Sequence, residues 1–181
     1  MSRAYTLSGS RNFQLTATPS AVISLIFYGL LLLLAGIYWL RLPVPEALLG
    51  SLLSIFLHWF SVAFHNFGHF LAAKGTGYPM VGLRFWFLLG TCIYPTDEPA
   101  LPKAIHVRRA LGGPLASAGL AILLGVLSYA TSMQGGVLWY VFILMLLENI
   151  MIFSLGAFLP LGFTDGSTLL SLRGKPDPVR L

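Results

Sequence analysis

Four long apolar stretches constrain the fold of this chain more than any other feature. They cover residues 21–40, 47–73, 111–130 and 137–159. A helix needs about 20 apolar residues to cross roughly 30 Å of hydrocarbon, so each stretch is long enough for one membrane span. Only 9% of the residues are charged, against roughly 25% in ordinary soluble domains. The sequence therefore predicts an all-α integral membrane protein, with four transmembrane helices in a single membrane domain over residues 21–170.

The positions of the basic residues predict how the spans are oriented. Every Lys and Arg except Arg41 precedes the first span, lies between the second and third spans, or follows the fourth. Because four spans place these segments on one side, the positive-inside rule assigns that side to the cytoplasm. We therefore expect residues 1–20 and 171–181 to be cytoplasmic tails, the second one short and solvated. The same asymmetry explains the net charge of +5 without a nucleic-acid partner.

The second stretch runs into the segment "VAFHNFGHFLAAKG", residues 62–75. His65 and His69 are four residues apart and face the same side of a helix, the spacing with which two imidazoles bind one tetrahedral zinc. At 1.5 Å per residue, His65 lies about 27 Å along the span, near its cytoplasmic edge. Pro160 and Gly162 break the helix after the fourth span, so Asp165 is expected at the same edge.

These motifs resemble those of the site-2 protease family of intramembrane zinc metalloproteases, over residues 51–170. The resemblance implies a zinc site made by His65, His69 and Asp165. It also implies that the segment "GYPMVGLRFWFLLGTCIYP", residues 77–95, is a re-entrant segment or β-hairpin between the second and third spans. Its edge strand would receive substrate by β-augmentation; a simple interfacial segment is the alternative.

The resemblance assigns substrate or partner binding to two further motifs. Gly113 and Pro114 match the middle motif of the family, with Ser117 where that motif has asparagine. Pro160 and Gly166 match the last motif, in which Ala157 stands at another asparagine position.

Asn66 is the departure with the largest chemical consequence, since the H-E-x-x-H motif has glutamate there. A carboxamide has no useful basicity near neutral pH, and loss of a general acid–base typically costs about 10²–10⁴ in rate. We therefore predict a zinc-binding pseudoprotease that acts as a scaffold or binding subunit of a membrane assembly, or holds a transmembrane partner.

Two alternatives stay open at the level of the sequence. One is an active intramembrane zinc metalloprotease that uses an unusual base. The other is a tetrapyrrole-binding membrane subunit, in which His58, His65, His69 or His106 ligates a haem iron or a chlorophyll magnesium.

Two further ionisable residues, His58 and Glu148, fall at membrane depth, where they are costly and mark candidate functional positions. On a continuous helix Glu148 lies about 25 Å from Asp165 along the axis, too far to replace the missing base. We expect a structural role for it, through a hydrogen bond to Asn149 or to a neighbouring span. Cys92 is the only cysteine, which excludes an intrachain disulfide and a cysteine-based zinc site.

Overall fold

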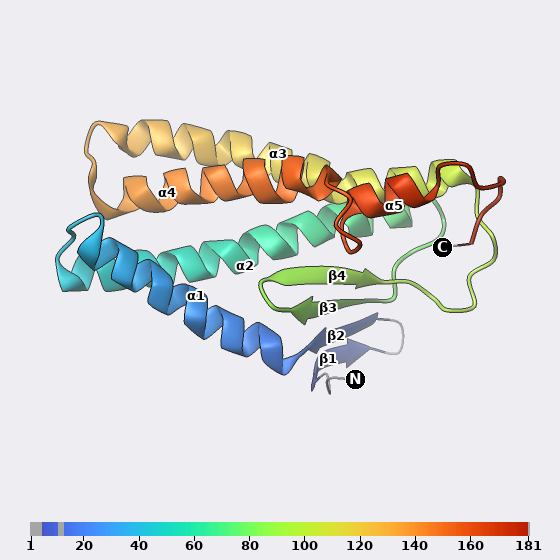
Figure 1. Cartoon of the computed structure of the whole chain (residues 1–181), viewed down its shortest axis with the longest axis horizontal. Coiled ribbons are helices and arrows are strands. Elements are labelled where there is room, and N and C mark those ends of the chain that lie inside the picture. The colour runs from blue at the N-terminus through green and yellow to red at the C-terminus, as the bar shows by residue number, and fades with distance from the viewer. Residues whose placement is uncertain (1–4, 11–12, 181) are drawn as a thin grey trace.

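Long helices running side by side form most of the molecule (Figure 1). The computed structural model describes residues 5–10 and 13–180. Within these residues, four helical segments are long and apolar enough to cross a membrane. They are α1 (Pro19–Tyr38), α2 (Val44–Lys74), α3 (Lys103–Ser132) and the segment Gly136–Phe158, which starts as α4 (Gly136–Glu148). The predicted membrane architecture of four helices is confirmed.

The third helix is longer than the predicted span, because α3 begins at Lys103 rather than near residue 111. Its first two turns carry Lys103, Arg108 and Arg109, so hydropathy alone does not mark them as part of the span. These turns continue the helix beyond the apolar stretch and carry groups that face the candidate site described below.

The fourth span changes its helical form along its length. After α4, the chain continues as a π-helix over Asn149–Leu155 and as one 3₁₀ turn over Gly156–Phe158. π-helical turns are rare and occur frequently at functional sites. Gly162, with φ +89°, then reverses the chain, and the short helix α5 (Asp165–Ser171) follows.

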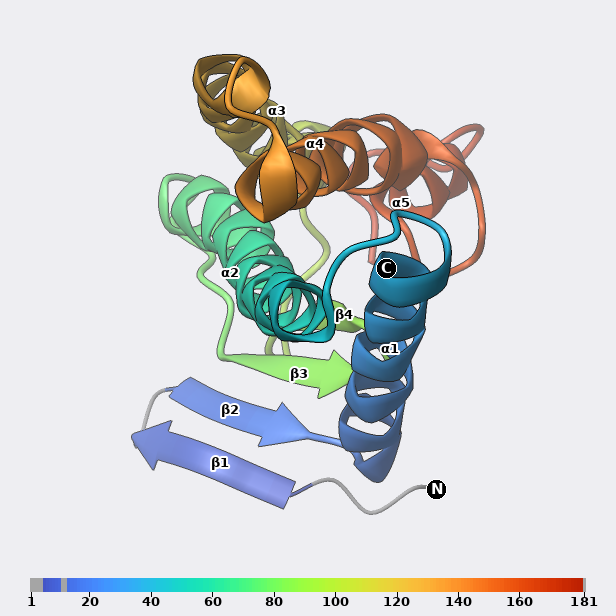
Figure 2. The ribbon, with the colours of Figure 1, turned by 90° about the vertical axis from the view of Figure 1, so that its left-hand side faces the viewer.

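A four-stranded sheet lies at one end of the bundle, as Figure 2 shows from the opposite end. The segment between the second and third spans forms the hairpin of β3 (Gly82–Trp86) and β4 (Leu89–Ile93), which confirms the predicted β-hairpin. The amino-terminal segment forms a second hairpin, β1 (Tyr5–Ser10) and β2 (Phe13–Ala17).

The amino-terminal hairpin differs from the expectation of a tail over residues 1–20. β2 pairs in parallel with β3, giving the strand order β1-β2-β3-β4. A two-stranded hairpin alone is marginal in water, so its partner strand far along the chain supplies the stabilisation that the local sequence does not reveal.

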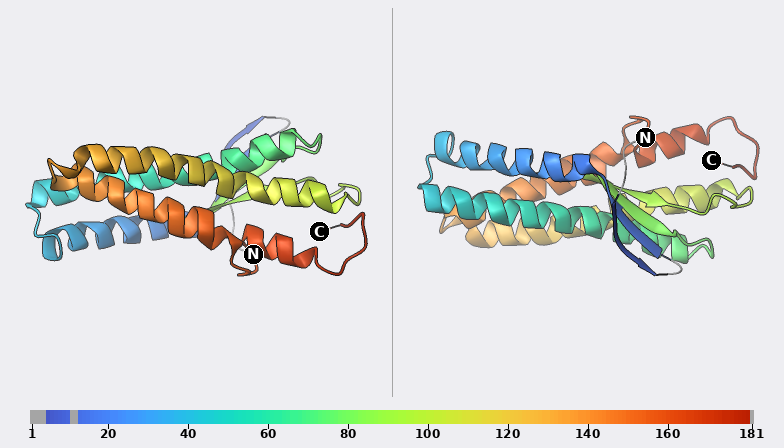
Figure 3. Two further views of the ribbon diagram at one scale, coloured as in Figure 1. Left: turned by 90° about the horizontal axis from the view of Figure 1, so that it is seen from above. Right: turned by 90° about the horizontal axis from the view of Figure 1, so that it is seen from below.

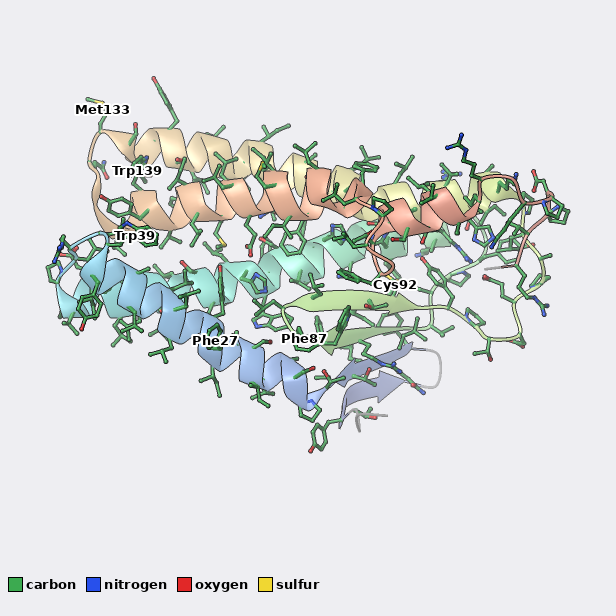
Figure 4. All side chains as sticks on the ribbon, viewed as in Figure 1. Phe27, Trp39, Phe87, Cys92, Met133 and Trp139 are labelled. Carbon is green, nitrogen blue, oxygen red and sulfur yellow. The ribbon has the colours of Figure 1, made fainter. Side chains whose placement is uncertain are left out.

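The two ends of the bundle have different structures (Figure 3). The connections from α1 to α2 and from α3 to α4 lie at one end, where Trp39, Met133 and Trp139 gather (Figure 4). The sheet and α5 lie at the other end. Large apolar side chains such as Ile23, Phe27 and Ile122 are exposed along the helices. Such a surface suits a lipid environment rather than water.

Close contact between α2 and α3 positions the candidate site. Gly68 and Gly112 meet where the helices cross: a Cβ at Gly68 would overlap the carbonyl oxygen of Gly112. Small residues allow two backbones to approach in this way inside a membrane protein. A core of Leu120, Leu124 and Met145 packs α3 against α4 nearby. The crossing sets the second span directly against the first half of α3.

Candidate metal centre

One helix and the start of another bring three ligand-type side chains together. His65 and His69 come from α2, and Asp165 is the first residue of α5. Their ligand atoms all lie within 4.8 Å of one another. The Nε2 atoms of His65 and His69 are 3.1 Å apart, and the Asp165 carboxylate oxygens lie 3.6 Å from His65 Nε2 and 3.4 Å from His69 Nε2.

These separations fit one small tetrahedral ion. Ligand atoms at about 2.0–2.2 Å from a zinc ion in tetrahedral geometry are roughly 3.3–3.5 Å apart, close to the three observed distances. Three protein ligands also leave a fourth coordination position open, as in catalytic rather than structural zinc sites. The residues therefore match zinc in number, chemical type and spacing.

The other ring nitrogens of the two histidines are fixed by neighbouring groups on α3. His65 Nδ1 lies 3.0 Å from Ser117 Oγ, and His69 Nδ1 lies 2.8 Å from the backbone oxygen of Arg109. Such partners orient histidine ligands and fix the tautomer that leaves Nε2 free for a metal. Gly113 lies against both rings, where a Cβ would overlap the Nε2 atoms.

The Asp165 carboxyl group is suited to a charged role. Burial alone would raise its pKa, but hydrogen bonds and charge from His65 and His69 outweigh that effect. The pKa of Asp165 therefore lies below its usual value. The side chain is a carboxylate at neutral pH, the protonation state that a metal ligand requires.

A cavity of about 860 Å³ opens beside the three ligands. Residues from α2, β4, α3, the end of the fourth span and α5 line it, among them Asn66, Cys92, Arg109, Phe153 and Ala157. Figure 4 shows Cys92 on β4, near the turn that leads from the fourth span to α5. β4 is the last strand of the sheet, so a sheet edge forms one wall of this cavity.

Asn66 lies in the cavity wall with both ends of its carboxamide engaged. Its Nδ2 donates to the Val62 carbonyl oxygen at 2.8 Å. Its Oδ1 accepts from the Cys92 thiol, with the two atoms 3.4 Å apart. Burial, together with the nearby Asp165 carboxylate, raises the pKa of the Cys92 thiol to about 12. The thiol is therefore protonated at neutral pH and able to donate.

The remaining residues of the two predicted binding motifs lie outside the cavity lining. Pro114 is buried inside α3, and its carbonyl oxygen accepts from Ser154 Oγ at 3.4 Å. Gly166 packs against the backbone of Phe158, where a Cβ would overlap the carbonyl oxygen. Pro160 is exposed at the end of the fourth span. These residues shape the backbone around the site and do not line the cavity.

His58 and Glu148 form a separate polar cluster between α2 and α4. His58 Nδ1 and Glu148 Oε1 are 2.7 Å apart, and both side chains are buried. Asn149 donates to Ser61 Oγ at 2.9 Å and to the Met145 carbonyl oxygen. Glu148 thus bonds to a neighbouring span, one of the two expected partners, rather than to Asn149.

The fourth histidine, His106, belongs to α3 and lines the cavity. Its Nε2 lies 3.2 Å from the backbone oxygen of Val179. Each of the four histidines therefore has a protein hydrogen-bond partner.

One group at the cavity was missed by sequence reasoning. Arg109 is buried and pairs with both carboxylate oxygens of Glu98, at 2.9 and 2.6 Å. Its guanidinium also lies 4.2 Å from the centre of the Tyr94 ring and donates to the Tyr78 carbonyl oxygen. In the sequence, Arg109 counts only as one of the basic residues that predict the orientation of the spans, so its burial at the cavity was not predicted. The one sequence feature that could have indicated it is its position one turn before Gly113 in the middle motif.

Comparison with known proteins bears on the fold. No protein-family model and no curated protein matches the chain. The structure is similar to that of the Site-2 Protease from Methanocaldococcus jannaschii, with a TM-score of 0.63 and 19% sequence identity. The similarity covers 95% of this chain and 74% of that chain. This chain has a site-2-protease-like fold. The resemblance inferred from the motifs is therefore confirmed at the level of the site-2-protease-like architecture.

Proposed function

We propose that this protein is a zinc-binding pseudoprotease of the site-2-protease-like fold. In this proposal it retains the metal site, has lost peptide hydrolysis, and serves as a scaffold or binding subunit for a transmembrane partner. The observation that carries the proposal is Asn66 in the cavity wall, next in sequence to His65. The resemblance calls for a glutamate at this position.

The chemistry of Asn66 supports the loss of hydrolysis. A glutamate would take a proton from water and pass it to the leaving amine, whereas a carboxamide cannot accept that proton. The hydrogen bonds of Asn66 to Val62 and Cys92 occupy its donor and acceptor within the protein. The expected loss of rate is about 10²–10⁴.

The ligand set supports retention of the metal. Asn66 is not one of the three ligand-type residues, so its identity does not remove the site. When bound, zinc acts as a Lewis acid. In the proposed role, His65, His69 and Asp165 would hold zinc and thereby tie α2 to α5, which contributes to folding stability.

The sheet edge supports a binding role. β4 ends the sheet, and Leu89, Gly90, Thr91 and Cys92 of this strand line the cavity. An extended segment can add to such an edge through backbone hydrogen bonds, with specificity supplied by alternate side chains. In the proposed function, an unwound segment of a transmembrane protein binds here and is held without being cleaved.

Cleavage of a single-span test substrate by the purified, zinc-supplemented protein tests the loss of hydrolysis. Wild type is expected to match a His65→Ala background. Asn66→Glu is expected to exceed wild type by about 100-fold or more, since it restores the general base. Asn66→Gln introduces a side chain of the same length as glutamate but without its charge, so its cleavage rate should stay at background. If wild type cleaves as fast as Asn66→Glu, the protein is an active protease and the pseudoprotease proposal is wrong.

Metal analysis tests the other half of the proposal. Purified wild type is expected to contain about one zinc per chain, and His65→Ala to contain much less, because structural and catalytic zinc sites depend on each protein ligand. Equal and negligible zinc in both proteins would contradict zinc binding and favour a metal-free scaffold or a tetrapyrrole-binding subunit.

A further inference from the structure

The segment 177–179 docks onto α3 instead of extending into solvent, which corrects the expectation of a solvated tail. Val179 and Leu101 form an antiparallel bridge, with backbone hydrogen bonds of 2.9 and 2.8 Å. Both side chains are buried, with exposed fractions of 6% and 1%. His106 Nε2 donates to the same Val179 oxygen. Burial of Val179 in an apolar contact explains the difference, since a lone valine between prolines and charges gives no such signal in sequence.

A side-chain contact adds to the backbone bridge. Asp177 Oδ1 accepts from the backbone nitrogen of Lys103 at 3.0 Å. Lys103 is the first residue of α3, so this carboxylate binds one of the amide groups left unpaired at a helix start. Arg180, the next residue after Val179, lines the large cavity together with His106.

The docked segment connects the two sides of the candidate metal centre. Asp165 begins α5, and the chain passes from α5 through residues 172–176 to the docked residues. On the other side, α3 supplies the Arg109 carbonyl oxygen that fixes His69. The docked residues bind to the start of α3, which is also the part of the helix that carries His106 and Arg109.

α5 needs such an external attachment. It has seven residues, far fewer than the roughly 12–15 at which an isolated helix becomes even marginally stable. The hydrogen bonds around Thr164 and Ser167 join only residues 159–167 to one another. Contacts of α5 with α3 and with the end of the fourth span, together with the docked segment, therefore supply the stability that keeps Asp165 in place.

We propose that residues 177–179 act as a clamp that holds the Asp165 side of the metal centre against α3 and restricts access to the cavity. Asp177 and Val179 are positioning residues in this arrangement. The metal-retention part rests on the proposed zinc site, whereas restricted access to the cavity depends only on the fold.

Two measurements on the full-length protein test the clamp. The first is the alkylation rate of Cys92, which lines the cavity; alkaline buffer is used because the pKa of this thiol is about 12. The second is the rate at which the zinc-loaded protein releases zinc to a chromogenic chelator. Asp177→Ala removes one hydrogen bond at an exposed position, and Val179→Asp disrupts the buried bridge. Lys175→Ala and Val179→Ile are the matched controls.

Both clamp variants are expected to raise both rates, Asp177→Ala by up to about tenfold, the effect of one typical hydrogen bond. The controls should behave like wild type. Alkylation and release rates equal to wild type in Asp177→Ala and Val179→Asp would overturn the proposal, as would faster alkylation with unchanged zinc release. If wild type holds no zinc, the zinc-binding function fails, and the Cys92 rates alone decide whether the clamp exists.

Discussion

At the scale of single residues, Gly113 has little freedom to change. It sits where α3 faces both imidazoles, and any side chain there would enter the space of the ligand nitrogens. Glycine at such a point permits close approach of a backbone to a functional group. The middle motif thus leaves room for the two rings of the candidate metal centre, and Ser117, one turn further along, is hydrogen-bonded to His65.

We expect Gly113→Ala to lose most of its zinc, because the added methyl group displaces His65 and His69 from their converging positions. Zinc content of the purified variant measures this. Gly119→Ala is the matched control, since Gly119 lies in the same helix with open space around its Cβ position. That variant should keep its zinc. Full zinc occupancy in Gly113→Ala would show that the rings do not hold the metal in the arrangement described here.

At the scale of helices, the pair of His58 and Glu148 links α2 to α4 inside the membrane. The two side chains are bonded to each other, while His58 Nε2 and Glu148 Oε2 have no hydrogen-bond partner among the described residues. A buried pair of this kind contributes modestly when intact, but leaving one member alone is expensive. The contact therefore specifies which faces of the two helices meet.

We expect His58→Leu to destabilise the protein by about 3 kcal/mol, because Glu148 is left buried without its partner. The double variant His58→Leu with Glu148→Leu should recover most of that loss, since apolar replacements of buried pairs are often neutral. Unfolding in detergent, followed for wild type, both single variants (His58→Leu and Glu148→Leu) and the double variant, gives the coupling energy. If the two losses simply add, the pair makes no specific link between the helices.

The sequence predicts some of these elements better than others, for physical reasons. The three candidate ligands can be predicted from the sequence, because helical spacing fixes His65 and His69 and span topology returns Asp165 to the same level. The strands β1 and β2 cannot be predicted in this way, because their stability depends on pairing with β3, far along the chain. Burial of Arg109 beside Glu98 and docking of Val179 also depend on tertiary contacts. Only the position of Arg109 one turn before Gly113 marks it in the sequence, and Val179 has no local pattern at all.

At the scale of the whole molecule, the candidate metal centre lies at one end of the bundle, and connections between helices lie at the other. The sheet, α5 and the candidate metal centre share one end, whereas the loops after α1 and α3 share the other. Of the basic residues that the structure describes, Arg41 alone belongs to the loop end. Such asymmetry favours a cytoplasmic location for the end with the metal centre.

We therefore expect opposite labelling of two positions in a Cys92→Ser background in intact cells. Gln134→Cys, in the loop after α3, should react with a membrane-impermeant thiol reagent, because it lies outside the cell membrane in this orientation. Lys175→Cys should be protected until the cells are permeabilised, after which both positions should react. Labelling of Lys175→Cys alone in intact cells would mean that the orientation is inverted.

Parallel pairing of β2 with β3 imposes an order on biosynthesis. Residues 14–17 align with residues 82–85, and α1 and α2 lie between them in the chain. While the nascent protein leaves the ribosome, β2 must wait until both intervening helices have been made and the second has returned to the starting side of the bilayer. The sheet can therefore be completed only after the first helical pair has been inserted. A chain arrested before residue 82 would expose the β3-pairing edge of β2 to chaperones and proteases.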